Sequence, residues 1–173
     1  MTERIRAELE ELRQFCEIGE GSITVDETED LDWINNWKQY FHQFYIDDIL
    51  VIPSWEDIKP EDEERMVLHI DPGTAFGTGM HETTQLCIRQ IRKHITPETE
   101  LLDVGTGSGI LAILSLMFGA KHAVGTDLDP CAVEAVKENC EVNGIRPEQF
   151  EMMIGNIITD KAVQDKVGYE KYD

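Results

Sequence analysis

The sequence predicts an α/β protein in which helices flank a parallel sheet. From residue 101 onward, short apolar runs alternate with helical patterns. A glycine-rich loop separates the first of these runs from the helix that follows it. Strand–helix–strand units of this kind make right-handed crossovers, so their strands lie parallel in one sheet.

The elements of this part follow from local signals. The apolar helix after the glycine loop is predicted to end near Gly119. The next helix has Asp129 as its cap and Pro130 at its first position, and it ends at Asn143 and Gly144. The apolar runs predict strands at residues 101–104, 123–126 and 150–154.

The upstream residues predict a mixture of helices and strands. Apolar residues at helical spacing from Ile5 to Cys16 predict a helix, and alternation in residues 22–26 predicts a short strand. The aromatic residues between positions 30 and 45 also have helical spacing, which core packing explains better than a binding surface does. Further predictions are strands at 49–53 and 66–70, an exposed acidic turn or linker at 56–64, and a helix running to Lys93 that Thr83 or Thr84 caps.

Composition bounds the class of protein. The chain has 173 residues, 41% of them hydrophobic, which suits one globular domain. There is no apolar run long enough to span a membrane, and the charged first residues do not resemble a secretory signal, so we expect a cytoplasmic protein. The four cysteines have no metal-binding spacing and are expected to be reduced thiols.

The net charge of −20 narrows the choice of partner. Such a field repels nucleic acid, because binding to phosphates needs lysine and arginine. It suits a basic protein or a cationic substrate, although a need for solubility explains an acidic surface equally well.

The glycine loop and a downstream acid together predict an adenosine-containing ligand. Gly105, Gly107 and Gly109 follow a strand and open a helix, so the backbone can turn sharply and a ligand can approach closely. Asp127 ends the next strand, 18 residues after Gly109. A carboxylate at that place can accept both hydroxyls of a ribose.

The spacing of the glycines favours S-adenosylmethionine over a dinucleotide. A dinucleotide fingerprint requires a third glycine where this chain has Ile110, which disfavours a nicotinamide-dependent dehydrogenase. Asp103, two residues before the first glycine, suits the cationic end of S-adenosylmethionine. Asp103 can also be a strand-end residue that bonds backbone amides, and both interpretations remain open.

Three stretches resemble known methyltransferases. Residues 101–113 (LLDVGTGSGILAI) resemble motif I of class I S-adenosylmethionine-dependent methyltransferases, and residues 125–130 (GTDLDP) resemble their second-strand motif. Residues 71–84 (DPGTAFGTGMHETT) resemble the segment that precedes motif I in the PrmA family, which methylates amino groups of the eleventh protein of the large ribosomal subunit. Residues 33–38 (WINNWK) resemble the linker of that family.

The resemblance implies a fold and a division into domains. The expected fold is a Rossmann-like class I methyltransferase core that is incomplete at its C-terminus, with an N-terminal α+β remnant. Residues 1–65 would be the remnant of the substrate-recognition domain and linker, and residues 66–173 the first half of the methyltransferase domain. Family members are about twice as long, with a further strand and an asparagine-containing motif after the position where this chain stops.

The resemblance also implies cofactor-binding residues. Thr84, with Gly105 and Asp127, would bind the cofactor, and Asn156 would contact its adenine or else serve only in a turn. His81 would act as a base or, as we favour, hold its loop by hydrogen bonds. The loop that covers the methionine end would contain Phe76, Gly77, Thr78 and His81.

The predicted reaction is transfer of the sulfonium methyl group to a neutral amine, for which the protein mainly supplies positioning. The expected substrate is a basic ribosomal protein. Alternatives are methylation of another protein or a small molecule, and a non-catalytic fragment whose exposed sheet edge promotes dimerisation.

Overall fold

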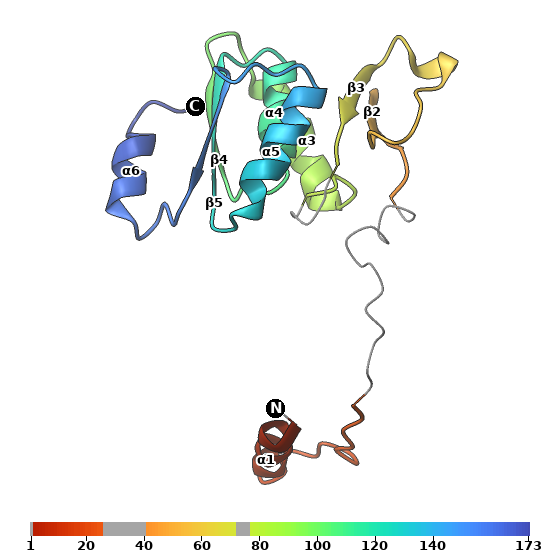
Figure 1. Ribbon diagram of the computed structural model, residues 1–173, viewed down its shortest axis with the longest axis vertical. Coiled ribbons are helices and arrows are strands. Elements are labelled where there is room, and N and C mark those ends of the chain that lie inside the picture. Colours follow the sequence, from red (N-terminus) through yellow and green to blue (C-terminus); the bar gives the residue numbers. More distant parts are fainter. Residues whose placement is uncertain (1, 26–40, 72–76) are drawn as a thin grey trace. The chain divides into compact units, whose positions relative to one another are not determined.

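The computed structural model describes residues 2–25, 41–71 and 77–173 (Figure 1). The chain divides into two compact units, Met1–Trp33 and Ile34–Asp173. No helix of the described residues is long and apolar enough to cross a membrane.

The first unit contains helix α1, Thr2–Leu12, which ends earlier than its apolar spacing predicts. None of the α1 residues is buried, and an ion pair between Arg4 and Glu8 at 2.8 Å lies on its surface. The predicted strand at residues 22–26 is wrong for residues 22–25, which have no regular structure, and residue 26 lies outside the described residues. An isolated strand without a partner has no ladder to stabilise it.

The second unit begins with a small three-stranded sheet. Its strands are β1 (Phe44–Ile46), β2 (Ile49–Ile52) and β3 (Met66–His69). β1 pairs antiparallel with β2, and β2 pairs parallel with β3, so two of the predicted strands are confirmed. The aromatic helix predicted through Tyr45 is wrong at its end, because Phe44 and Tyr45 pair with β2, and its residues 30–40 lie outside the described part.

The acidic turn at residues 56–64 contains one buried carboxylate. A short 3-10 helix, η2 (Pro60–Asp62), lies there, and Asp62 is only 1% exposed although the whole run was predicted to be exposed. Tyr45 Oη and Arg65 Nε each donate to Asp62 at 2.8 Å. These bonds satisfy the buried charge, and the hydrogen bond to Asp62 raises the pKa of Tyr45.

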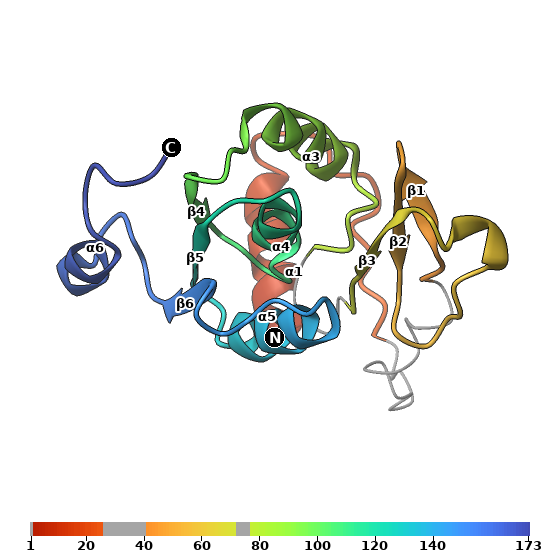
Figure 2. The same cartoon turned by 90° about the horizontal axis from the view of Figure 1, so that it is seen from above.

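The predicted parallel sheet is confirmed. It consists of β4 (Glu100–Val104), β5 (His122–Asp127) and β6 (Phe150–Ile154) in the order β4-β5-β6. One face carries α3 (Glu82–His94), α4 (Ile110–Met117) and α5 (Cys131–Val142), and α6 (Lys161–Val167) lies on the other (Figure 2). Asp129 Oδ1 accepts from the Cys131 amide, as a cap of α5 should, although the helix begins one residue later than predicted.

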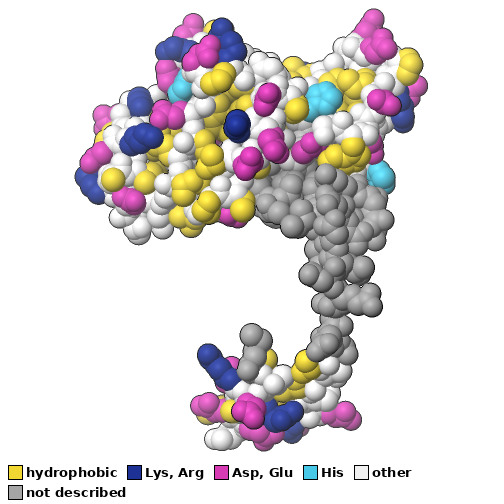
Figure 3. Space-filling view, in the orientation of Figure 1, with side chains coloured by type: hydrophobic (Ala, Val, Ile, Leu, Met, Phe, Trp, Pro, Cys, Tyr) yellow, Lys and Arg dark blue, Asp and Glu magenta, His cyan; other side chains and the backbone are white. Residues whose placement is uncertain are grey.

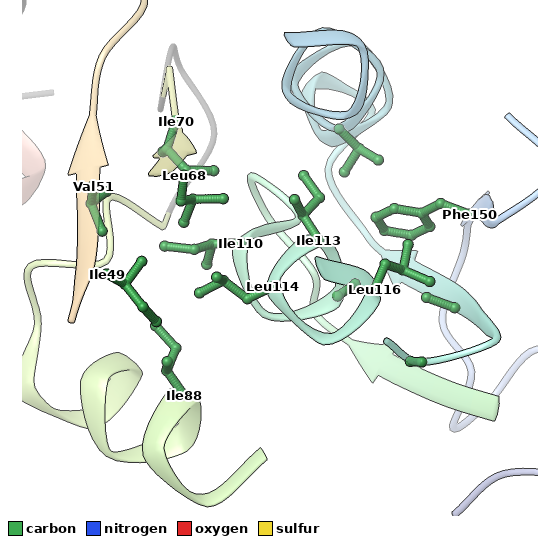
Figure 4. Close-up of a cluster of buried hydrophobic side chains, with 14 of the residues drawn as sticks. Ile49, Val51, Leu68, Ile70, Ile88, Ile110, Ile113, Leu114, Leu116 and Phe150 are labelled. Carbon is green, nitrogen blue, oxygen red and sulfur yellow. The ribbon is translucent and has the colours of Figure 1, made fainter. Parts of the chain in front are cut away.

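Helix α4 is buried because it lies between the two sheets. Ile110, Ile113 and Leu114 are at most 3% exposed. They meet side chains of the small sheet and of α3 on one side and of β6 on the other (Figure 4). The residues labelled around α4 in that figure are Ile49, Val51, Leu68, Ile70, Ile88 and Phe150.

This shared core bears on the predicted domain boundary between residues 65 and 66. Strands β2 and β3 pair across that boundary, and both contribute to the core around α4. The structure therefore places these residues in one compact unit, Ile34–Asp173. That the residues before 66 belong to a substrate-recognition domain and linker stays a prediction.

Two ion pairs fix α3 to the turn between β1 and β2. Arg89 Nε donates to Asp47 Oδ2 at 3.0 Å, and Arg92 contacts Asp48 through both of its terminal nitrogens. The Arg92 guanidinium lowers the pKa of Asp48 to about 2. These contacts join the C-terminal half of α3 to the small sheet.

Candidate functional site

The glycine loop joins the end of β4 to the start of α4, as predicted. Gly105, Gly107 and Gly109 all have positive φ angles, of 77°, 54° and 82°. A Cβ atom on Gly105 would meet nothing within 4 Å, so this glycine faces open space. A Cβ on Gly109 would lie 3.1 Å from Val136 Cγ2, so Gly109 allows α4 to approach α5.

Asp127 lies beside this loop, where the sequence predicts a ribose-binding acid. It ends β5 and is half-buried. The Gly107 amide donates to Asp127 Oδ2 at 2.8 Å, and the Asp129 amide donates to Oδ1 at 2.9 Å. Each carboxylate oxygen can accept a further hydrogen bond, so the side chain is oriented by the backbone and still able to bind hydroxyls.

Asp103 is the second acid of the site. Its Oδ2 accepts from Thr106 Oγ1 at 2.8 Å, so this acid bonds a side chain of the glycine loop. Burial raises the pKa of Asp103, and the charge of Asp127 raises it further, whereas hydrogen bonds from Thr106 and the Ala112 amide oppose both effects. Asp103 also lines an apolar groove of about 390 Å³ between α3 and β4.

The segment that begins at Gly77 contacts the glycine loop directly. Ser108 Oγ donates to the Gly77 carbonyl at 2.6 Å. A Cβ on Gly77 would lie 2.7 Å from Ser108 Oγ, and φ at Gly77 is 118°, so only glycine fits here without strain. Thr78 Oγ1 accepts from the Met80 amide at 3.3 Å. Phe76, the remaining predicted member of this loop, lies outside the described residues.

His81 caps helix α3. Its Nδ1 accepts from the Thr83 amide at 3.3 Å and lies 2.7 Å from Thr83 Oγ1. The prediction that Thr83 or Thr84 is the cap is therefore wrong, because the histidine side chain already satisfies the amide that a cap would bind. Thr84 is half-buried in the first turn of α3.

Asn156 follows β6, at the same end of the sheet as the glycine loop. Its Oδ1 accepts from the Ile158 amide at 2.9 Å and from the Thr159 amide at 3.3 Å. The side chain thus serves in a turn, which is the simpler of the two predicted roles. Contact with an adenine stays a prediction.

The sequence interpretation missed the residues that join these segments. Asn139 of α5 is fully buried and bonds both Asp71 and Ser108. The only signal was the pair Asn139 and Asn143, four residues apart and so on one face of a helix. Across the described residues, no cluster of histidine, cysteine and acidic side chains has metal-binding geometry, and all four cysteines are free thiols.

Replacing His81 with alanine tests its role as a cap. We expect His81→Ala to lower the free energy of unfolding by about 0.5–2 kcal/mol, because the Thr83 amide loses its acceptor. His81→Asn should restore most of the loss, since asparagine is a good cap. Urea denaturation measures both variants, and equal stability of His81→Ala and the parent would contradict the assignment.

Comparisons with known proteins agree with this geometry. The family model for ribosomal protein L11 methyltransferase (PrmA) matches residues 2–170. The chain is 58% identical to the ribosomal protein L11 methyltransferase of Lachnospira eligens and 51% identical to that of Agathobacter rectalis. Each alignment covers 100% of this chain and 54% of the relative, so the chain spans about half the length of the curated relatives it matches.

A solved structure shows the same relationship. The crystal structure of the ribosomal protein L11 methylase from Lactobacillus delbrueckii subsp. bulgaricus is 34% identical, with a TM-score of 0.61. The match covers 70% of this chain and 61% of that one. Together with the glycine loop and the acid that it binds, these matches show that the chain belongs to the ribosomal protein L11 methyltransferase (PrmA) family.

Proposed function

We propose that this chain supplies the cofactor-binding half of an S-adenosylmethionine-dependent methyltransferase that N-methylates a ribosomal protein. One observation carries the proposal: Asp127, at the end of β5, is hydrogen-bonded to the glycine loop that follows β4. In open parallel sheets, ligands bind at the carboxyl ends of the strands, which is where both features lie.

The residues present suit an adenosine-containing cation. Asp127 retains acceptor capacity for the two ribose hydroxyls, and Gly105 leaves open space beside it. Asp103 offers a carboxylate for the ammonium of the methionine end. The residues that we assign to the cofactor site are Thr84, Asp103, Gly105, Gly107, Gly109, Asp127 and Asn156, with the loop residues Phe76, Gly77, Thr78 and His81.

The chemistry requires little from the protein beyond orientation. S-adenosylmethionine supplies an activated methyl group on a sulfonium, and the attacking amine must be neutral. A lysine amine has a pKa of about 10.4, and desolvation beside a cation lowers it. His81 Nδ1 is occupied as a helix cap, so we assign His81 to loop structure and not to proton transfer.

The names of the relatives suggest the substrate. We infer that the substrate is ribosomal protein L11, recognised as a basic protein by a chain whose net charge is −20. On the face shown in Figure 3, acidic and basic side chains of the described residues are interspersed, without a patch of lysine and arginine that would suit nucleic acid. We place this activity in the cytoplasm, where ribosomal proteins are made.

Asp127→Ala tests the cofactor site. The substitution removes charge-assisted hydrogen bonds of about 1.5–3 kcal/mol each, so affinity for S-adenosylhomocysteine should fall at least about tenfold. Calorimetric titration measures it, with Asp165→Ala on α6 as the control that should bind like the parent. Unchanged affinity in Asp127→Ala would show that the acid is misassigned, and preference of the parent for NAD would overturn the cofactor.

The pH dependence of binding tests Asp103. A raised pKa means that the folded protein disfavours the carboxylate, so the stability contribution of this group falls as pH rises through the raised pKa. The ligand ammonium favours the carboxylate, so affinity should rise with pH over the same range. Asp103→Asn should bind more weakly and without this rise. Calorimetric titration at a series of pH values from acidic to neutral measures the affinity of both proteins. If the affinity of the parent depends on pH as little as that of Asp103→Asn, the proposed contact between Asp103 and the ligand ammonium is wrong.

The open edges of the main sheet suggest self-association. β4 and β6 are the edge strands of this sheet. Among the described residues, Asp173 exchanges hydrogen bonds with the Glu100 backbone on the outer side of β4. Exposed backbone groups of this kind pair with other strands. We propose that this chain dimerises through such an edge, and sedimentation velocity at rising concentration should show the dimer. A monomer at every concentration would exclude it.

A further inference from the structure

Helix α5 presents two amide side chains to the free edge of β3. Asn143 Oδ1 accepts from the His69 amide at 2.9 Å, and its Nδ2 donates to the His69 carbonyl at 2.6 Å. Asn139 Oδ1 accepts from the Asp71 amide at 2.9 Å, and its Nδ2 lies 3.4 Å from the Asp71 carbonyl. Because a backbone N–H can only donate, these contacts fix which atom of each amide is the oxygen.

The match follows from the geometry of the two elements. Four residues along a helix advance about 6 Å, and two residues along a strand advance about 6.6 Å. A carboxamide carries the same donor and acceptor as a peptide group. The two asparagines therefore pair with β3 and its extension much as another strand would, and they protect this sheet edge.

Asn139 differs from Asn143 in the further bond that its Nδ2 makes, since Asn143 Nδ2 donates to the Asn139 carbonyl at 2.7 Å. Asn139 Nδ2 also donates to the Ser108 carbonyl of the glycine loop at 2.9 Å. The same serine binds the Gly77 carbonyl through its hydroxyl. Asn139 and Ser108 are both fully buried, so water cannot replace these bonds. Three segments distant in sequence thus converge on one amide: α5, the glycine loop, and the strand extension that ends at Asp71.

Asp71 is held from its other side as well. The Ser54 amide donates to Asp71 Oδ1 at 2.8 Å, and the Ser54 hydroxyl bonds to Oδ2. These bonds restrain Asp71. Asn139 in turn bonds both the Asp71 amide and the Ser108 carbonyl, and so connects the glycine loop to Asp71. Two residues of the proposed cofactor site are next to these bonds. Gly77 accepts from the Ser108 hydroxyl, and Gly109 follows the Ser108 carbonyl that Asn139 binds.

We propose that Asn139 is a positioning residue, which holds the glycine loop and, through Ser108, the segment that begins at Gly77 in the arrangement that the cofactor requires. This inference rests on the proposed function for the identity of the ligand. Fixing both segments before binding spares the ligand the entropy of ordering them. The loss of Asn139 therefore weakens cofactor binding as well as the fold, whereas the loss of Asn143 weakens only the fold.

Three variants of this chain separate the two effects. Asn139→Asp keeps the acceptor for the Asp71 amide but sets a carboxylate against two carbonyl oxygens. Ser108→Ala keeps the Ser108 carbonyl and removes the bond to Gly77, in case the Asn139 variant does not fold. Asn143→Ala is the matched control, because it loses the pairing with His69 without touching the glycine loop.

Calorimetric titration with S-adenosylhomocysteine and urea denaturation are then compared. We expect Asn139→Asp to lower affinity at least about tenfold and Ser108→Ala to lower it several-fold. We expect Asn143→Ala to lose stability but to bind within about twofold of the parent. Parent-like affinity in both Asn139→Asp and Ser108→Ala would overturn the proposal, as would an equal loss of affinity in Asn143→Ala.

A measurement without ligand distinguishes failure of this inference from failure of the proposed function. In amide NMR spectra of the unliganded chain, Asn139→Asp should shift the Gly107, Gly109 and Gly77 resonances, and Asn143→Ala should leave them in place. If the parent does not bind S-adenosylhomocysteine, the proposed function fails and the spectra alone decide. Unshifted loop resonances in Asn139→Asp would refute the positioning role whatever the affinity.

Discussion

The burial of helix α4 is the constraint on which the rest of this structure depends. The helix is apolar on nearly every side, and it is covered by the small sheet β1–β3, by α3 and α5, and by the parallel sheet. An apolar helix of this kind is stable only when it is surrounded. Its N-terminus is the glycine loop, so the packing that buries α4 also fixes the place of the candidate cofactor site.

The site is built at the junction of these layers, and polar groups hold it there. The glycine loop binds Asp127 through the Gly107 amide and Gly77 through the Ser108 hydroxyl. Asn139 ties the loop to the end of the small sheet. The bond between Asn139 and Ser108 is fully buried, which makes a missing partner costly there and the arrangement specific. The small sheet is therefore part of the site and more than an appendage to the parallel sheet.

The two acids of the candidate site have the same sign of charge as the chain as a whole, whose net charge is −20. Asp103 and Asp127 both lie where we propose that a cationic ligand binds, and the charge of Asp127 adds to the burial that raises the pKa of Asp103. The chain also spans only about half of its curated relatives, and its parallel sheet has two edge strands. We propose that cofactor binding is the part of the methyltransferase activity that these residues perform.

The sequence by itself determined the parallel sheet, the glycine loop and the acid at the end of β5. Those features depend on local signals, namely apolar runs, turn glycines and the spacing to Asp127, and each lies where it was predicted. Residue patterns that resemble the PrmA family likewise indicated the family that the comparisons show.

Tertiary structure decided what depends on partners distant in the chain. Phe44 and Tyr45 have helical spacing in the sequence but pair with β2 in the structure. The cap of α3 is His81, where Thr83 or Thr84 was predicted. Asp62 is buried because Tyr45 and Arg65 bind it. Asn139 acquires its contacts only when α5 packs against β3 and the glycine loop. An asparagine in a helix looks the same in sequence whether it faces water or joins three segments, because local propensity does not encode its neighbours.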